Sequence, residues 1–210
     1  MAKKRAPEMT LARWLERARS TQVRNQITAD PTQEDFQAII QVAARRQTLD
    51  WEEVVALLHM VYGWMPTMLR PIEPHTKVQR SQLLNYLQKV KMGSLLTTDE
   101  LSDVQRFANR SVVGMSKLLH VLSPENYAIW DSRVAEAFLW SGVTLVAYST
   151  IDRYVEYMDA LRHWAKNLDV IRECAALRKL NPMLEGAGNL RLVELVLFCK
   201  LDAQLLTLLP

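Results

Sequence analysis

Apolar residues recur at the spacing of an α-helix along almost the whole chain of 210 residues. Ile151, Tyr154, Val155 and Met158, for example, lie three and four positions apart, which places them on one face of a helix. The same spacing recurs in residues 11–18, 36–44, 51–62, 83–90, 115–122 and 134–139. Only residues 143–148 have the local character of a strand, and so short a segment cannot form a sheet. The sequence therefore predicts an all-α fold with about nine or ten helices.

Residues that favour helix ends flank several of these stripes. Thr10 and Asp50 precede apolar stripes and are expected to be N-caps, because their side-chain oxygens can accept a backbone N–H of the first turn. The sequence TTDE at 97–100 predicts another helix start. The preceding helix is expected to end near Gly93, because glycine readily follows a last helical turn.

The clearest interruption of the helical pattern is GWMPTMLRPIEPH at 63–75, which contains three prolines. This segment is either a hinge between two lobes or an ordered loop held by Trp64 and Met65. A second break, NPMLEGAGN at 181–189, resembles a turn before the last helix. The sequence predicts a basic segment with the first helix at 1–24. A single all-α globular domain follows at 25–210, and 63–75 is where two lobes would meet.

The closing stretch, NLRLVELVLFCKLDAQLL at 189–206, is apolar on several sides of a helix. Such a helix is either central to the core or covered by a protein partner. Arg191, Glu194, Lys200 and Asp202 interrupt its apolar run, so no membrane-spanning helix is predicted.

Basic residues gather at the start of the chain. The net charge is +3, but residues 1–24 carry seven basic and two acidic side chains, a local charge of +5, so the remainder carries −2. A basic leading segment of this kind suits contact with phosphate or with an acidic partner. The alternative is a solvated helix face.

Cys174 and Cys199 lie in helical stretches without CxxC spacing, and both are expected to be inert core thiols. A disulfide framework, a zinc site and an iron–sulfur cluster are unsupported, which favours a reducing compartment such as the cytoplasm. No apolar segment follows the basic N-terminus, as a signal peptide would require.

The common cofactor and metal motifs are absent. The chain has no phosphate-binding glycine loop, no dinucleotide fingerprint, no HExxH and no GxSxG, so no cofactor is predicted. The four histidines are not paired one helical turn apart, so no metal site is predicted. His120 falls outside the apolar stripe of its helix and is expected at the surface or at the edge of a site.

One block, SVVGMSKLLHVLSPENYAIWDSRVAEAFLWSG at 111–142, remains after these exclusions. It reads as a turn, a short helix, a proline-containing loop, two apolar residues, an aspartate and a second helix. This order resembles the second half of the helix-hairpin-helix DNA glycosylases, which include the 8-oxoguanine and endonuclease III types. In that family a hairpin with glycine precedes a helix with a lysine near its start. Gly114 and Lys117 stand at these positions, and IWDSRV places Asp131 at the family's aspartate, which opens the next helix.

The resemblance implies a DNA-binding protein that excises a damaged base. Cleavage of an N-glycosidic bond builds positive charge on the sugar, which the Asp131 carboxylate would stabilise in a dry pocket. The amine of Lys117, deprotonated by desolvation, would attack C1′ and form a Schiff base. Failing that, Lys117 would contact a phosphate.

The resemblance also implies a set of DNA contacts. Backbone amides at Gly114 and Ser116 would hold a phosphate at the start of the helix. Arg110 and Arg133 would bind the DNA backbone. A flipped base would be received, or its gap in the duplex filled, by an aromatic side chain; the candidates are Trp64, Trp130 and Trp140.

Each of these residues has a structural alternative. Asp131 is also a suitable N-cap for a helix at 132–140, and Lys117 suits a solvated helix face. Arg133 would pair with Asp131 instead of a phosphate. Trp130 suits the hydrophobic core, and Trp64 suits a packed loop.

A second hypothesis for the function comes from another class of protein. The chain would be a non-catalytic helical binding protein derived from the same fold, with a protein partner at the apolar C-terminal helix. The single glycine in the hairpin region and the spacing of 14 residues between Lys117 and Asp131 favour this hypothesis. The basic N-terminus and the IWDSRV pattern favour the first.

Overall fold

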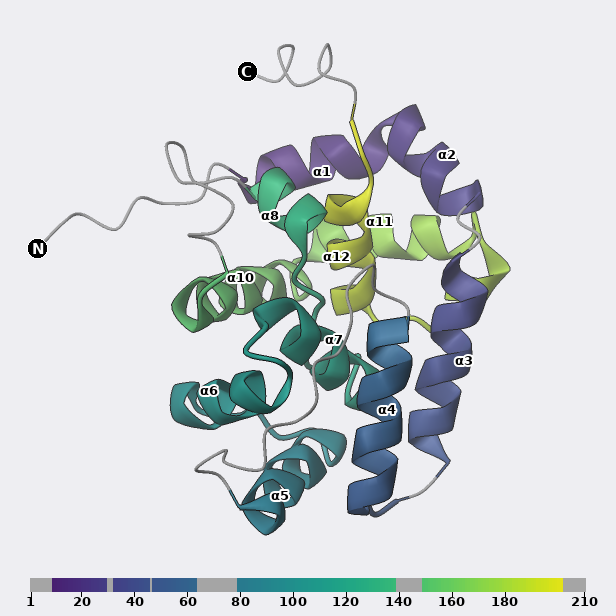
Figure 1. The fold of residues 1–210 in the computed structure, drawn as a ribbon. Helices are drawn as coiled ribbons and strands as arrows, with labels where there is room; N and C mark the ends of the chain where they lie inside the picture. The colour runs from purple at the N-terminus through teal and green to yellow at the C-terminus, as the bar shows by residue number, and fades with distance from the viewer. Residues whose placement is uncertain (1–8, 30–31, 46, 64–78, 139–148, 202–210) are drawn as a thin grey trace, which may run out of the picture.

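The computed structural model describes residues 9–29, 32–45, 47–63, 79–138 and 149–201. These residues form eleven α-helices and one short 3₁₀-helix and contain no strand, which confirms the all-α prediction (Figure 1). The helices are α1 (Leu11–Arg19), α2 (Thr21–Ala29), α3 (Thr32–Ala44), α4 (Trp51–Gly63), α5 (Arg80–Lys91), α6 (Thr98–Phe107), α7 (Val112–Leu122), α8 (Ser132–Phe138), α10 (Ile151–Trp164), α11 (Leu168–Arg178), η1 (Pro182–Leu184) and α12 (Asn189–Phe198).

Several helices begin where a side chain caps the backbone N–H groups of the first turn. The Thr10 hydroxyl accepts a hydrogen bond from the Arg13 backbone N–H at 3.3 Å, and the Asp50 carboxylate accepts one from Glu53 at 2.8 Å. Thr97 forms a complete capping box with Glu100 at the start of α6. Gly93 follows α5 with a φ of 84°, a left-handed conformation that glycine adopts at little cost. The predicted ends near these residues are confirmed.

Helix α2 was not predicted as a separate element. Ser20 breaks the helical run after α1 with an extended backbone, and its hydroxyl accepts a hydrogen bond from the Val23 backbone N–H at 3.3 Å. Serine often caps a helix in this way, but one serine between two helical stretches is a weak signal. The described helices are therefore slightly more numerous than expected.

Helix α12 lies at the centre of the hydrophobic core. It packs against α1, α2, α8, α10 and α11, which surround it in Figure 1. Its apolar residues are all buried from Leu190 to Leu197. The apolar closing stretch was expected either to be central to the core or to be covered by a protein partner. Its residues in α12 are buried in the chain's own core.

Two predictions fall on residues that the structure does not describe. Helix α4 ends at Gly63, and the segment 64–78, including Trp64, lies outside the described residues, as do 139–148 with Trp140 and the strand-like stretch. Buried side chains on both sides of the first gap, such as Tyr62 and Leu83, belong to one hydrophobic cluster that extends from Trp14 to Cys199.

The first helix packs directly on the core. The indole N–H of Trp14 donates to the Val193 carbonyl at 3.0 Å, which joins α1 to α12. Arg17 is 6% exposed and bonds to carbonyls at the end of α12. Arg19 and Arg24 both pair with Glu173 of α11, at 2.7 and 3.0 Å. Three arginines of the basic segment therefore bind the protein itself.

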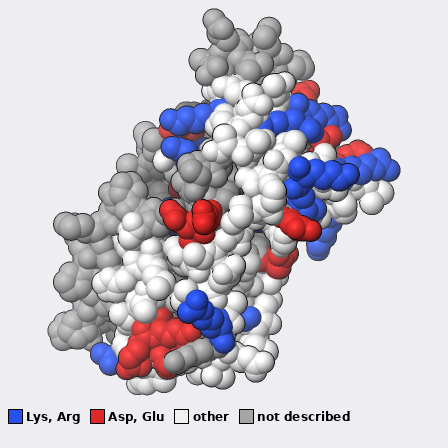
Figure 2. All heavy atoms as spheres, turned by 90° about the vertical axis from the view of Figure 1, so that its right-hand side faces the viewer, with Lys and Arg blue, Asp and Glu red and all other residues white. Residues whose placement is uncertain are grey.

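The charged side chains do not form a single uniform field on the face that Figure 2 presents. Lys and Arg side chains lie mostly in the upper half of this view, with acidic side chains among and below them. Among the described residues, basic and acidic side chains are therefore interspersed on this face, with no broad surface of one sign.

Candidate functional site

Helices α6 and α7 form a hairpin joined by residues 108–111. Asn109 and Arg110 both have left-handed backbones, with φ of 58° and 55°. Asparagine tolerates this conformation, whereas for arginine it is strained by about 1 kcal/mol. The Ser111 hydroxyl then accepts a hydrogen bond from the Gly114 backbone N–H at 3.1 Å and caps α7. The Arg110 side chain is exposed at this turn.

Gly114 does not lie in the hairpin turn, so that part of the prediction was wrong. It lies in the first turn of α7, where a Cβ would come within 2.4 Å of the Tyr62 hydroxyl oxygen. The same hydroxyl donates to the Ala108 carbonyl at 2.9 Å. The Tyr62 ring packs against Gly114, and its hydroxyl is bonded to the C-cap residue of α6. Any side chain larger than that of glycine would collide with the ring.

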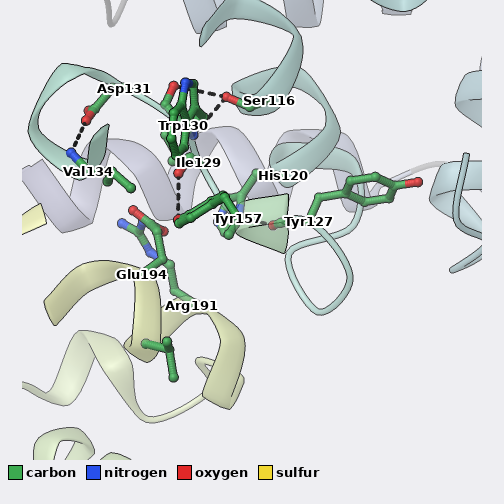
Figure 3. Close-up of polar contacts among 12 residues, drawn as sticks. Ser116, His120, Tyr127, Ile129, Trp130, Asp131, Val134, Tyr157, Arg191 and Glu194 are labelled. Atoms are coloured by element: carbon green, nitrogen blue, oxygen red, sulfur yellow. Dashed lines mark hydrogen bonds and ion pairs between the residues drawn. The ribbon is translucent and has the colours of Figure 1, made fainter. Parts of the chain in front are cut away.

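A buried segment that belongs to no helix, residues 127–130, lies between α7 and α10 and bonds to side chains of both helices (Figure 3). Its residues Tyr127 to Trp130 are almost completely buried, yet they have no helix to satisfy their backbone groups. Side chains do so instead. The hydroxyl of Tyr154 donates to the Ala128 carbonyl at 3.1 Å, and that of Tyr157 donates to the Ile129 carbonyl at 3.0 Å. Such partners remove the cost of burying bare backbone.

Ser116 and Trp130 meet inside the protein. The Ser116 hydroxyl accepts the Trp130 backbone N–H at 3.0 Å and lies 2.9 Å from the Val113 carbonyl, to which it donates. The Trp130 side chain is 1% exposed and packs on Tyr157, with ring centroids 4.9 Å apart. The core interpretation of Trp130 is confirmed. The Ser116 hydroxyl and the Trp130 ring therefore contact other parts of the protein and are buried from solvent.

Asp131 follows this buried segment and immediately precedes α8. Its carboxylate accepts a hydrogen bond from the Val134 backbone N–H at 3.0 Å, and its carbonyl accepts the Ala135 N–H at 2.9 Å (Figure 3). These are the two bonds of an N-cap, so the predicted capping role is confirmed. The Asp131 side chain is only partly buried, which leaves its charge available for further interactions.

Lys117 is buried in the first half of α7 with 8% of its surface exposed, so the solvated alternative was wrong. Its ammonium interacts electrostatically with Asp131 and with Glu194 of α12. Burial lowers the pKa of Lys117 below its ordinary value, although Asp131 and Glu194 oppose this shift. The Lys117 ammonium and the Asp131 carboxylate of the sequence pattern therefore interact electrostatically.

Two further charges from α12 complete this group. Glu194 is 1% exposed and forms a buried ion pair with Arg191, one turn earlier. Burial raises the pKa of Glu194 to about 6, even though the neighbouring Arg191 acts in the opposite direction. We call Lys117, Asp131, Arg191 and Glu194 the charge cluster. Sequence reasoning missed Arg191 and Glu194 as site residues, although two charges inside an otherwise apolar helix were a visible signal.

His120 is fully buried, so the prediction of a surface or site-edge histidine was wrong. Its Nδ1 lies within hydrogen-bond distance of the Tyr127 carbonyl, which can only accept, so Nδ1 carries the proton. Its ring stacks near Phe36, with centroids 5.2 Å apart. Burial and the nearby Arg191 lower the pKa of His120 to about 3, which keeps the imidazole neutral at pH 7.

The two arginines predicted to bind the DNA backbone, Arg110 and Arg133, are both exposed. Arg133 is exposed on α8, and its guanidinium carbon lies 4.7 Å from the centre of the Phe198 ring. This cation–π contact stabilises a charge that the start of a helix disfavours. Arg110 lies at the α6–α7 turn.

Both cysteines are buried free thiols, and burial raises the pKa of Cys174 to about 12, so the prediction of buried thiols is confirmed. Within the described residues no group of His, Cys, Asp and Glu side chains is arranged to hold a metal ion. No helix in the same part of the chain has the length and apolarity needed to cross a bilayer. Comparisons of the chain with protein-family models, curated proteins and solved structures find no match.

Proposed function

We propose that this chain binds DNA through the α6–α7 hairpin and excises a damaged base as a helix-hairpin-helix glycosylase. The observation that carries the proposal is the burial of Lys117 in α7, where its ammonium interacts electrostatically with Asp131 at the start of α8. Lys117 lies in α7, the second helix of the α6–α7 hairpin, and Asp131 follows later in the chain, which is the order that the resemblance implies.

The pair has the chemistry that N-glycosidic cleavage requires. Burial lowers the pKa of Lys117 and so increases the share of neutral amine, the form that attacks C1′ while the base departs with the bonding electrons. The Asp131 carboxylate is held in one orientation by the Val134 N–H, and a fixed carboxylate stabilises the positive charge that develops on the sugar.

Arg110 is the side chain best placed to contact the DNA backbone. It is exposed at the turn between α6 and α7, whereas the side chains of Ser116 and Trp130 are buried. We therefore assign the phosphate contact to the turn and to Arg110.

Borohydride trapping tests the lysine mechanism. The full chain is incubated with duplexes that each carry one damaged base, and borohydride reduces the Schiff base to a stable amine. We expect a covalent protein–DNA product with one of these duplexes, and none with Lys117→Met, which fills a similar volume without an amine. Lys89→Met is the matched control, because Lys89 is an exposed lysine paired with Glu100 on the surface. A complete set of duplexes without any trapped product would exclude the lysine mechanism.

Arg110→Gly is expected to stabilise the protein while it weakens DNA binding. Glycine adopts the left-handed backbone without strain, so we expect the free energy of unfolding to rise by about 0.5–1 kcal/mol. Loss of one phosphate contact is expected to reduce the slope of log affinity against log salt by about one. Denaturant unfolding and duplex binding at several salt concentrations measure the two effects.

Arg110→Ala separates the causes of these two effects. Alanine removes the guanidinium but keeps the left-handed strain, so it should lose affinity without gaining stability. A salt slope unchanged in both variants would exclude Arg110 as a phosphate contact.

The side chains of Ser116 and Trp130 are buried within the protein and are not exposed to a ligand. Their burial favours a second candidate function, a non-catalytic DNA-binding protein of the same fold. This candidate predicts salt-dependent duplex binding that Arg110→Ala weakens, together with no trapped product on any damaged base. Affinity that does not change with salt would exclude both candidates.

A further inference from the structure

Ser116 joins the two parts of the chain that carry the proposed site. It lies directly before Lys117 in α7, and Trp130, to which it bonds, lies directly before Asp131. Because consecutive Cα atoms are about 3.8 Å apart, the bond between Ser116 and Trp130 limits how far the backbones of the next two residues can separate. Figure 3 shows this bond between α7 and the segment that leads into Asp131.

The Ser116 hydroxyl is oriented by its own helix. It donates to the Val113 carbonyl at 2.9 Å, and the Trp130 carbonyl lies 3.3 Å from the same oxygen. A hydroxyl has one hydrogen and two lone pairs, so this oxygen also accepts the Trp130 backbone N–H, at 3.0 Å. Ser116 is 0% exposed, and solvent therefore does not compete for these bonds.

Other contacts hold the buried segment at different points. The Tyr157 ring of α10 packs on the Trp130 ring, with centroids 4.9 Å apart. His120 of α7 bonds to the Tyr127 carbonyl, three residues before Trp130. Neither contact lies beside the lysine of α7. Loss of the Ser116 hydroxyl would remove an acceptor of the Trp130 N–H and loosen the start of α8 from α7.

We propose that Ser116 is a positioning residue that fixes Lys117 relative to Asp131 through its bond to Trp130. The proposal rests on the proposed function, because it assigns the residue that aligns the attacking amine with the stabilising carboxylate. Reacting groups must be held in a near-attack geometry, and a displacement of about 1 Å is enough to slow a reaction strongly. Ser116 is buried and acts through its neighbours in the chain rather than on the DNA.

Single-turnover borohydride trapping measures this role on the duplex that the wild-type protein attacks. In Ser116→Ala we expect the trapping rate at saturating duplex to fall by about 10-fold or more, because the amine and the carboxylate are no longer aligned. The duplex affinity should stay unchanged, because the exposed turn at Arg110 is intact. Ser116→Thr keeps the hydroxyl and should restore most of the rate.

Ser20→Ala is the matched control. The Ser20 hydroxyl accepts the Val23 backbone N–H at 3.3 Å between α1 and α2, so this variant loses the same kind of bond away from α7 and α8. Its trapping rate should equal that of the wild type. An equal fall in both alanine variants, or an unchanged rate in folded Ser116→Ala, overturns the positioning role and leaves the glycosylase proposal intact. If Ser116→Ala does not fold, Ser116→Cys takes its place under the same criteria, because a thiol has a similar shape but is a weaker acceptor.

A titration without DNA measures the same coupling. In protein with ¹³C-labelled lysine, the Cε signal of Lys117 is identified by its loss in Lys117→Met. The Asp131 carboxylate raises the pKa of Lys117, so Ser116→Ala should shift the midpoint to lower pH, by less than Asp131→Asn does. In the Asp131→Asn background, Ser116→Ala should cause no further shift. Glu194 and Arg191, which also act on Lys117, are the same in both backgrounds.

The two experiments separate this proposal from the proposed function. If the wild-type protein traps no duplex, the lysine mechanism is excluded, and the titration alone decides the role of Ser116. A midpoint that falls only when Asp131 is present supports the positioning role. A midpoint that does not move, or that moves equally in the Asp131→Asn background, overturns it.

Discussion

Arg17→Met is expected to lower the free energy of unfolding by about 3–5 kcal/mol, because Arg17 satisfies the carbonyl end of the central helix. Its Nε donates to the Val196 carbonyl at 2.8 Å, and its Nη2 donates to Leu197 at 3.2 Å and to Cys199. These carbonyls belong to the last turn of α12 and have no following helical N–H groups to bind. Methionine keeps most of the apolar stem but leaves buried oxygens without donors.

The charge of Arg17 adds to this effect. The end of a helix carries partial negative charge, and a guanidinium there is favourable. Burial lowers the pKa of Arg17, yet arginine remains protonated at neutral pH. A structural role of this kind also means that Arg17 does not contribute to the basic surface of residues 1–24.

Thermal and denaturant unfolding of two further variants give the comparison. Arg17→Lys keeps the charge but cannot reach three carbonyls with one planar group, so we expect a loss close to that of Arg17→Met. Arg19→Ala removes an exposed guanidinium that pairs with Glu173, and its effect on stability should be much smaller than that of Arg17→Met. Equal stabilities for Arg17→Met and Arg19→Ala would contradict the capping role.

The proposed glycosylase function predicts that Asp131→Asn reduces base excision by about 100-fold or more and leaves the stability nearly unchanged. Asparagine caps a helix about as well as aspartate, so the bond from the Val134 N–H is kept and the free energy of unfolding should change by less than about 0.5 kcal/mol. The negative charge is lost, and with it the stabilisation of the positive sugar. Single-turnover cleavage of the duplex found by trapping measures the rate, and duplex binding should be retained.

Asp50→Asn is the matched control for this prediction. Asp50 caps α4 with the same bond, from the Glu53 backbone N–H at 2.8 Å, and it is not a member of the charge cluster. Its substitution should change neither stability nor excision. If Asp131→Asn and Asp50→Asn behave alike in the excision assay, Asp131 is a cap and nothing more.

Much of the fold could be predicted because helix formation depends on residues within four positions of one another. The periodic stripes, the caps at Thr10 and Asp50 and the break at Gly93 all concern such short distances. The role of Asp131 as an N-cap was accessible for the same reason. Gly114 was misplaced because a glycine signals either a turn or a close approach, and only the position of Tyr62 shows which.

Helix α7 explains why the site was harder to predict. Its residues from Gly114 to Leu122 are all buried, because α3, α4, α5 and α6 pack around it. An apolar stripe predicts one buried face, so Lys117, Ser116 and His120 were expected on the outside. The polar atoms of Ser116 and His120 instead bond to the buried segment 127–130, and the Lys117 ammonium interacts electrostatically with Glu194 of α12, which no local pattern indicates.

The sequence by itself determined that the chain is helical, where several helices begin and end, and that an aspartate opens α8. Tertiary structure alone decided what surrounds that aspartate. Arg17 donates to carbonyls about 180 positions away, and Lys117 interacts electrostatically with Glu194 of the last described helix. The physical reason is that burial and electrostatic interaction depend on distance in space, whereas helical periodicity and capping depend on distance along the chain.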